Sequence, residues 1–323
     1  DKLRIVFMGT PEFAVASLEA LLDSKHEIVG VVTMPDKAIG RHHEVLQASP
    51  VKECALRHGI PVLQPEKLKD EDFLTELRSL NADLQIVVAF RMLPEVVWAM
   101  PRLGTFNLHA ALLPQYRGAA PINWSIIHGD RITGITTFWL DHQIDTGRII
   151  CQETLPIGPD DCAGDIHDRM MVQGAQLVCR TADMIASGEA EAVPQEQFMT
   201  DEPLRPAPKI FKETCQIRWS NLKVQSAHNF VRGLSPYPAA WTTITEAKGK
   251  HTILKVFKTH PEECTHHLPA GTLETDGKNW LRVALTDGYL YLEEIQQAGK
   301  KRMSVTDFLR GAHMEDARLI EEE

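Results

Sequence analysis

Two polar residues, Asn107 and His109, are well suited to chemistry at a carbonyl carbon. They lie two positions apart in TFNLH, a run that predicts a β-strand, so their side chains should point to the same side. An asparagine amide donates a neutral hydrogen bond, whereas an imidazole can donate a hydrogen bond or exchange a proton near neutral pH. Such a pair can stabilise the oxyanion that forms when a nucleophile attacks a carbonyl group.

A carboxylate would complete this group, and Asp145 lies in an Asp-Thr-Gly sequence soon after the apolar run GITTFWL. A buried acid next to His109 would orient the imidazole and balance its charge during proton transfer. On residue types alone a second interpretation stays open, because Asn, His and Asp at strand ends also form ordinary hydrogen-bonded turns. Tyr116 and Arg117, which follow in LPQYRG, would then be a surface pair.

The segments that must position these residues alternate between strand and helix patterns. LRIVFMG, EIVGVVT, IPVLQP and ADLQIVVAF predict strands, and EFAVASLEALLDSKH, VKECALRHG and DEDFLTELRSLN predict the intervening helices. This alternation is typical of an α/β fold with a doubly wound, mostly parallel sheet, which binds ligands beyond the carboxyl ends of its strands. Asn107, His109 and the loop after Val88 all lie at such ends.

The pattern changes after a long predicted helix that ends at Gly188. The proline-rich TDEPLRPAPKI predicts a linker, and the short runs AWTTIT, TILKVFKT, WLRVAL and YLYLEEI predict a small antiparallel barrel of the OB type. We therefore expect a Rossmann-like catalytic domain over 1–203, a linker over 204–208, an OB-like domain over 209–313 and an acidic tail over 314–323.

Charge is distributed unevenly along the chain, whose formal net charge is −10. Residues 1–204 carry 17 basic and 29 acidic side chains, whereas residues 205–310 carry 16 basic and 10 acidic ones. Residues 205–310, which include most of the second domain, therefore have a net charge of +6 inside an acidic protein. A basic face of this kind favours contact with a nucleic-acid backbone.

Several other functions lack their usual sequence signals. The six cysteines form no Cys-x-x-Cys pair and no His-Glu-x-x-His occurs, so neither a disulfide framework nor a metal site is expected. MGTPEFAV lacks the later glycines of a dinucleotide-binding turn. The first strand is too short to span a bilayer and has no cleavage site, which predicts a cytoplasmic protein without a membrane partner.

The stretch NLHAALLPQYRGAAPINWSI, followed by GITTFWLDHQIDTGRII, resembles the signature of the formyltetrahydrofolate-dependent formyltransferases. The resemblance runs nearly end to end, through RIVFMGTPEFAV, TMPDKAIGR, VVAFRMLP, APKIFKE, LSPYPAAWT and AGKKRMSVTDFLRG. Matched residue by residue, the catalytic Asn, His and Asp of the family fall on Asn107, His109 and Asp145. Four further residues match the motif: Leu113, Pro114, Arg117 and Gly118.

The resemblance implies transfer of the formyl group of 10-formyltetrahydrofolate, without a metal, to the α-amino group of methionyl initiator tRNA, for translation initiation. No obligate protein partner is expected. The implied folate-binding residues are Val88, Ala89, Phe90, Arg91, Met92, Leu93, Leu140, His142 and Ile144. The implied tRNA-binding residues are Lys37 and Arg41 in the loop from Thr33 to Pro50, and Lys209, Lys212, Lys300, Lys301 and Arg302 in the second domain.

Alternatives stay open within and beyond this family. An enzyme on the same scaffold would formylate an amino-sugar nucleotide or glycinamide ribonucleotide, or hydrolyse the folate, and a protein of another class would bind RNA without catalysis. The chain also departs from the family pattern: Ala111 stands where serine is frequent, and His42 and His43 stand where lysine is frequent. The histidines leave the affinity of the first loop for tRNA in question.

Overall fold

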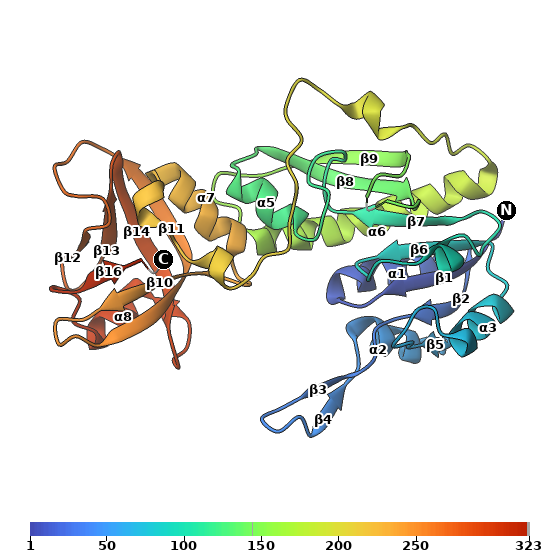
Figure 1. Cartoon of the computed structure of the whole chain (residues 1–323), viewed down its shortest axis with the longest axis horizontal. Coiled ribbons are helices and arrows are strands. Elements are labelled where there is room, and N and C mark those ends of the chain that lie inside the picture. The colour runs from blue at the N-terminus through green and yellow to red at the C-terminus, as the bar shows by residue number, and fades with distance from the viewer. Residues whose placement is uncertain (144, 322–323) are drawn as a thin grey trace. The chain divides into compact units, whose positions relative to one another are not determined.

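The computed structural model describes residues 1–143 and 145–321. The chain forms two compact units, which are treated separately below (Figure 1). The first unit comprises Asp1–Gly118, Thr133–Pro156 and His167–Pro206, and the second comprises Ala119–Ile132, Ile157–Ile166 and the chain from Ala207 onward. The uninterrupted domain boundaries expected from the sequence stay a prediction.

The first unit is built on a sheet of seven strands. Their spatial order is β5 (Val62–Leu63), β2 (Glu27–Val32), β1 (Arg4–Gly9), β6 (Leu84–Val88), β7 (Thr105–His109), β8 (Ile132–Trp139) and β9 (Ile149–Pro156). Neighbouring strands from β5 to β7 are parallel, and β8 is antiparallel to β7. The chain moves outward in one direction from β1 to β5 and then returns to place β6 on the other side of β1. Such a reversal marks the usual ligand-binding edge of a doubly wound sheet.

The predicted helices and strands of this unit are confirmed, with small shifts at their ends. The helices are α1 (Glu12–Leu22), α2 (Pro50–Arg57), α3 (Glu71–Ser79), α4 (Glu95–Trp98) and α6 (Ala163–Ser187), which begins in the second unit, and η1 (Gln195–Phe198) is a 3-10 turn. Ser49 and Asp70 cap α2 and α3 through their side chains. No described helix is long and apolar enough to cross a membrane.

Gly9 ends β1 at the point where β6 and α1 approach it closely. A Cβ atom at this position would lie 2.6 Å from the carbonyl oxygen of Val88 and 2.8 Å from Cβ of Ala14. The close packing of strand and helix thus requires glycine at position 9. Dinucleotide binding is not needed to explain it. The same contact fixes the end of β6, from which the loop after Val88 starts.

We expect Gly9→Ala to lower the free energy of unfolding by about 1–3 kcal/mol, because the added methyl group meets backbone rather than a flexible side chain. Urea unfolding followed by circular dichroism measures the change. Gly311→Ala is the matched control, since a Cβ at position 311 meets nothing within 4 Å. Equal stability of the two variants would contradict the close approach.

The loop between Thr33 and Pro50, for which no secondary structure was predicted, contains a hairpin of β3 (Lys37–Ile39) and β4 (Val45–Gln47). Both strands are exposed along their length, and the side chain of Leu46 is 70% exposed. The hairpin stands away from the seven-stranded sheet (Figure 1). An isolated two-stranded ribbon is only marginally stable in water, so this one is suited to change shape when a partner binds.

The second unit contains a nearly closed, barrel-like antiparallel sheet, as predicted. Its strand order is β12 (Leu273–Thr275), β13 (Leu281–Leu285), β14 (Gly288–Gln297), β11 (His251–Glu263), β10 (Ala240–Thr245) and β16 (Arg318–Ile320), with β15 (Met303–Ser304) paired to β14. Register shifts near Lys258 interrupt the pairing of the long strand β11 with β14. Such bulges bend a strand, which lets a small sheet curve around its own core.

Helices and 3-10 turns complete this unit: α5 (Pro121–Ile127), α7 (Val224–Leu234), α8 (Val305–Gly311), η2 (Glu213–Cys215) and η3 (Trp219–Asn221). The core includes Trp219, a large side chain that is 1% exposed and whose indole nitrogen donates to Oγ1 of Thr242 at 2.9 Å. Apolar side chains of α7, α8 and the inner faces of the strands surround it.

Candidate active site

Asn107 lies on β7, paired in the sheet with Val87 on one side and Phe138 on the other. Its side chain is half-buried, and its Oδ1 atom is buried without a hydrogen-bond partner among the described residues. An unpartnered buried amide oxygen carries a free-energy cost that a bound ligand can offset. The position therefore has the character of a binding group rather than of a turn former.

His109 is the last residue of β7, and 7% of it is exposed. Its Nε2 atom donates to the carbonyl oxygen of Tyr116 at 2.8 Å. The other ring nitrogen, Nδ1, lies 3.9 Å from Oδ2 of Asp145, a separation longer than a hydrogen bond. Because Nε2 already donates a hydrogen bond, Nδ1 is the ring nitrogen that remains to exchange a proton with a substrate.

Asp145 is held from two sides in a backbone conformation with φ of 55°. Its Oδ2 atom accepts a hydrogen bond from the backbone N–H of Gly118 at 3.0 Å, and its carbonyl oxygen accepts one from Nε2 of Gln195 at 2.8 Å. Gly118 has a φ of 129°, which a residue with a Cβ adopts only with strain. The motif glycine therefore aims its N–H at the carboxylate.

Gln195 organises the loop around Asp145, and nothing in the sequence pointed to it. The residue is 1% exposed, and its Nε2 atom also donates to the carbonyl oxygen of Gly147 at 2.8 Å. Its Oε1 atom accepts from Nη2 of Arg117 at 2.7 Å. The Gln195 amide thus joins Arg117 to Asp145. Arg117 therefore has a buried partner and is not the surface residue that the second interpretation of the sequence left open.

We expect Gln195→Ala to lower kcat about ten- to a hundredfold, because losing its four side-chain hydrogen bonds lets the Asp145 loop shift relative to His109. Two of these bonds are to Arg117, and one each is to the carbonyl oxygens of Asp145 and Gly147. The rate of the reaction that the sequence resemblance implies, measured under saturating substrates, tests this expectation. Gln197→Ala is the control, since this exposed residue shares the 3-10 turn and has no side-chain hydrogen bond among the described contacts. Equal activity of both variants would show that Gln195 does not position the site.

The stretch from Ala111 to Gly118 is fixed largely by backbone contacts. Oγ1 of Thr136 donates to the carbonyl oxygen of Ala111 at 2.6 Å and accepts from the N–H of Leu113 at 3.3 Å. The peptide bond from Leu113 to Pro114 is cis. The N–H of Tyr116 donates to the carbonyl oxygen of Arg205 at 2.7 Å, so a segment far along the chain also holds the motif.

The residues predicted to bind folate come together from two segments. Phe90, Leu93 and Leu140 belong to one hydrophobic cluster, and the ring of His142 packs edge-on against Trp98. Ala89 is exposed, with a φ of 51°, and Met92 is also exposed, whereas Val88 is buried. The Arg91 guanidinium donates to the carbonyl oxygens of Pro65 and Glu66, and burial lowers its pKa. Ile144 lies outside the described residues.

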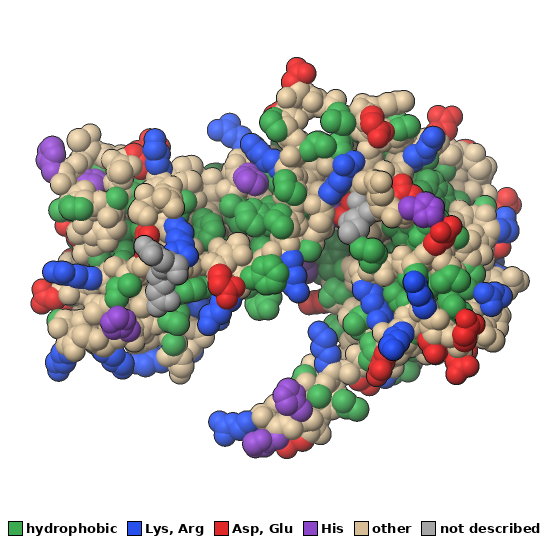
Figure 2. Space-filling model, in the orientation of Figure 1, with side chains coloured by type: hydrophobic (Ala, Val, Ile, Leu, Met, Phe, Trp, Pro, Cys, Tyr) green, Lys and Arg blue, Asp and Glu red, His purple; other side chains and the backbone are tan. Residues whose placement is uncertain are grey.

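The residues predicted to bind tRNA differ in their surroundings. Lys37 and Arg41 are exposed on the hairpin, whose free end also carries histidine side chains (Figure 2). Lys209, Lys212, Lys300 and Lys301 are exposed, and Nζ of Lys209 lies 5.6 Å from the ring centre of Phe211. Arg302 forms an ion pair with Glu294 and lies over the ring of Phe257. Its charge is therefore already partly compensated.

Two family models match most of the chain. Residues 3–182 match the family described as formyl transferase, and residues 209–313 match the formyl transferase C-terminal domain. Proteins named methionyl-tRNA formyltransferase are similar over nearly the whole chain. The one from Parabacteroides distasonis is 59% identical over 312 residues, which are 96% of each chain, and the one from Bacteroides fragilis is 55% identical over 317 residues, 98% of this chain and 97% of the relative.

Solved structures share the fold at low identity. An N-formyltransferase from Helicobacter canadensis, in complex with folinic acid and dTDP-3-aminofucose, has a TM-score of 0.65 at 18% identity over 93% of this chain and 100% of its own. HypX from Aquifex aeolicus, in complex with tetrahydrofolic acid, has a TM-score of 0.61 at 19% identity over 97% of this chain and 48% of its own. Both similarities concern architecture alone.

Proposed function

The chain belongs to the formyl transferase family, and from this we propose that it transfers the formyl group of 10-formyltetrahydrofolate to the α-amino group of methionyl initiator tRNA. The observation that carries the proposal is the similarity, over nearly the full length of both chains, to proteins named for this reaction. A cytoplasmic location suits a reaction on tRNA.

The reaction would take place around Asn107 and His109. The neutral amine of the methionyl group attacks the formyl carbon, a new N–C bond forms, and the carbonyl oxygen takes on negative charge. The Nδ2 group of Asn107 would donate to this oxygen, and the buried Oδ1 atom, which has no partner among the described residues, would accept from the N–H of the attacking amine. A donor preorganised for a developing oxyanion stabilises the transition state without rearrangement.

Proton movement would fall to His109 and Asp145. The amine loses a proton as the N–C bond forms, and the folate nitrogen gains one as the bond from the formyl carbon to that nitrogen breaks. Nδ1 of His109 is the ring nitrogen free for this exchange, and the carboxylate 3.9 Å away stabilises positive charge on the ring. The gap between the two groups leaves their contact open to a substrate atom or a water molecule.

The folate would bind along the strand ends near these groups. Backbone from Val88 to Leu93 can pair with the edge of a pterin ring, while Phe90 and Leu140, members of one cluster, supply apolar surface. We also propose that residues of the hairpin and the basic side chains of the second unit hold the tRNA, with Lys37 and Arg41 as phosphate contacts.

The direct test measures formyl transfer from 10-formyltetrahydrofolate to purified acceptors. Initiator methionyl-tRNA, elongator methionyl-tRNA, an amino-sugar nucleotide and no acceptor are compared side by side. Formylation confined to the initiator is the expected result. Transfer to the sugar alone, or folate hydrolysis without acceptor, would overturn the assigned acceptor and leave the site chemistry standing. Binding of tRNA without any transfer would favour a non-catalytic RNA-binding protein.

The hairpin makes a separate prediction. We expect the double variant Lys37→Ala, Arg41→Ala to raise KM for tRNA about tenfold with little change in kcat, because two exposed phosphate contacts are lost. The control is Lys2→Ala, Lys25→Ala, which removes the same charge. These two lysines precede the amino ends of β1 and β2, whereas the hairpin follows the carboxyl end of β2. Similar KM values for the two double variants would show that Lys37 and Arg41 of the hairpin do not contact the tRNA.

A further inference from the structure

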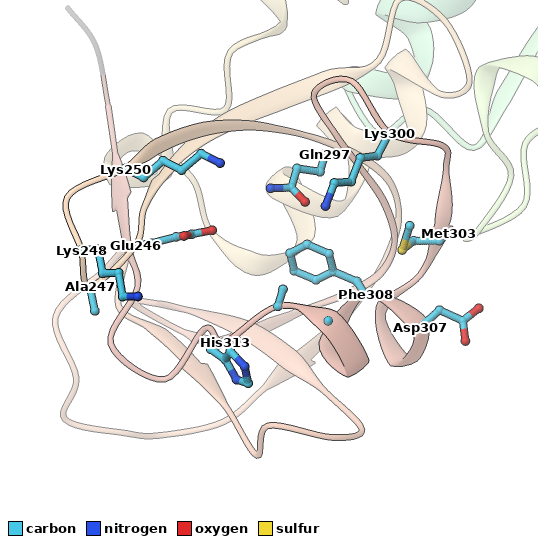
Figure 3. Close-up of a pocket in the computed structure, with 12 residues that line it drawn as sticks. Glu246, Ala247, Lys248, Lys250, Gln297, Lys300, Met303, Asp307, Phe308 and His313 are labelled. Carbon is cyan, nitrogen blue, oxygen red and sulfur yellow. The ribbon is translucent and has the colours of Figure 1, made fainter.

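The second unit contains a cavity of about 410 Å³ that the formyl transfer reaction does not use. The cavity lies at one end of the barrel, between the turn that joins β10 to β11, the turn that joins β14 to β15, and helix α8 (Figure 3). Its volume is in the range of small-molecule sites.

Two well-defined turns form the rim. The first is closed by a hydrogen bond from the N–H of Glu246 to the carbonyl oxygen of Lys250 at 2.9 Å, and the second by one from the N–H of Lys300 to the carbonyl oxygen of Gln297 at 2.9 Å. The N–H of Ala298 donates to the carbonyl oxygen of Ile253 at 3.0 Å, which ties the second turn to strand β11. The rim is therefore held by backbone.

Positive charge dominates the cavity. Lys248, Lys250 and Lys300 line it, and the structure gives none of them an ion pair within the described residues. Of the two acids in the lining, Asp307 is paired with Arg310 at 3.0 Å, so Glu246 is the acid that faces the lysines. In Figure 3 the amino groups of Lys250 and Lys300 are directed toward the interior, whereas Asp307 points away from it.

The floor is apolar and includes a ring. Phe308, a core residue that is 5% exposed, contributes its ring to the floor of the cavity, and Met303 also lines it (Figure 3). In this view the Gln297 amide lies between the amino groups of Lys250 and Lys300, and it can both donate and accept hydrogen bonds. Lysines at the rim, an amide and an aromatic floor are complementary to a phosphate, to the edge of a base and to its flat apolar face, respectively.

We propose that this cavity binds a nucleotide, with its phosphates on Lys248, Lys250 and Lys300 and its base near Gln297, Met303 and Phe308. The nucleotide has two possible sources: a free nucleoside polyphosphate, or an unpaired nucleotide of the tRNA. A site for inorganic anions alone would have no use for the apolar floor.

Isothermal titration calorimetry of the full chain with ATP and with GTP tests the proposal, with inorganic triphosphate and adenosine as probes of the two parts. We expect saturable binding of at least one of the two nucleotides that is tighter than binding of either part. The triple variant Lys248→Ala, Lys250→Ala, Lys300→Ala should weaken it about tenfold or more, because three charge contacts are lost. The control Lys223→Ala, Lys258→Ala, Lys278→Ala removes the same charge from positions outside the cavity.

Absence of saturable binding, binding of triphosphate as tight as that of the nucleotides, or equal loss in the two triple variants would overturn the proposal. Thermal unfolding of both variants verifies that each is folded. None of these readouts depends on formyl transfer, so failure of the cavity proposal leaves the proposed function intact.

Competition between the mononucleotide and initiator tRNA identifies the source of the nucleotide. This experiment rests on the proposed function. It uses the double variant Lys248→Ala, Lys250→Ala, which keeps Lys300 because that residue is separately proposed as a tRNA contact, and the double control Lys223→Ala, Lys278→Ala. If the cavity accepts a nucleotide of the tRNA, the bound mononucleotide will compete with initiator tRNA, and the cavity variant will raise KM for tRNA more than its control does. If the ligand is free, the tRNA affinity of the two double variants will be equal while the mononucleotide affinities differ. Both results require the binding of a nucleotide in the cavity.

Discussion

Replacement of Asn107 by alanine is expected to lower kcat for formyl transfer about 10²–10³-fold, the usual effect of removing one preorganised donor from a developing oxyanion. Affinity for tRNA should stay within about twofold, because the amide acts on the formyl group rather than on the nucleic acid. Single-turnover formylation gives the rate, and filter binding of tRNA gives the affinity.

Thermal unfolding separates this loss from a folding defect. Because Oδ1 of Asn107 is buried without a partner among the described residues, its removal should leave stability unchanged or slightly higher. Asn123→Ala, which removes a hydrogen bond to the carbonyl oxygen of Gly233 in the second unit, provides a control outside the site. Turnover of Asn107→Ala within fivefold of the parent enzyme would remove Asn107 from the catalytic group.

Asp145→Asn is expected to have a second large effect, with kcat falling about 10²–10³-fold. The amide keeps the shape of the side chain, and its oxygen can still accept a hydrogen bond from the N–H of Gly118, but the negative charge opposite Nδ1 of His109 is lost. A ring that gains a proton during the reaction would then have no countercharge.

The adjacent loop supplies a matched control for this variant. Asp141 is exposed, and its carboxylate accepts hydrogen bonds from Gln143 and Thr146 without facing His109. Asp141→Asn should leave kcat within about twofold, the scale of an ordinary surface change. A comparable loss in both variants would mean that loop order, rather than the charge of Asp145, determines the rate.

The sequence predicted the sheet, and it placed Asn107 and His109 on one side of a single strand, because both features depend on local pattern. β1, β2, β6 and β7 are apolar runs bounded by polar or turn residues, and burial on both faces makes such runs easy to recognise. Asn107 and His109 are two apart on one of these strands, so a period of two was enough to place them on one side. Asp145 was assigned only through the family motif, because it lies in a loop after β8, far from His109 in the sequence.

Other features could not be predicted because they depend on distant parts of the chain. Gln195 lies in a polar stretch without periodicity, and its role exists only because that stretch lies against the Asp145 loop. The pairing of β3 with β4 is weakly specified by a sequence that exposes both faces. The ion pair of Arg302 with Glu294 depends on strand register, which the basic run Lys300 to Arg302 does not reveal.

The contacts from Gln195 and Arg205 to the motif loop have a consequence for biosynthesis. His109 and Asp145 leave the ribosome well before the residues that fix their surroundings, since Tyr116 is held by Arg205 and Asp145 by Gln195. A nascent chain that ends before position 195 can form the parallel strands but cannot complete the hydrogen bonds around the carboxylate. Catalytic competence should therefore arise late in translation, in one step, when this segment closes on the sheet.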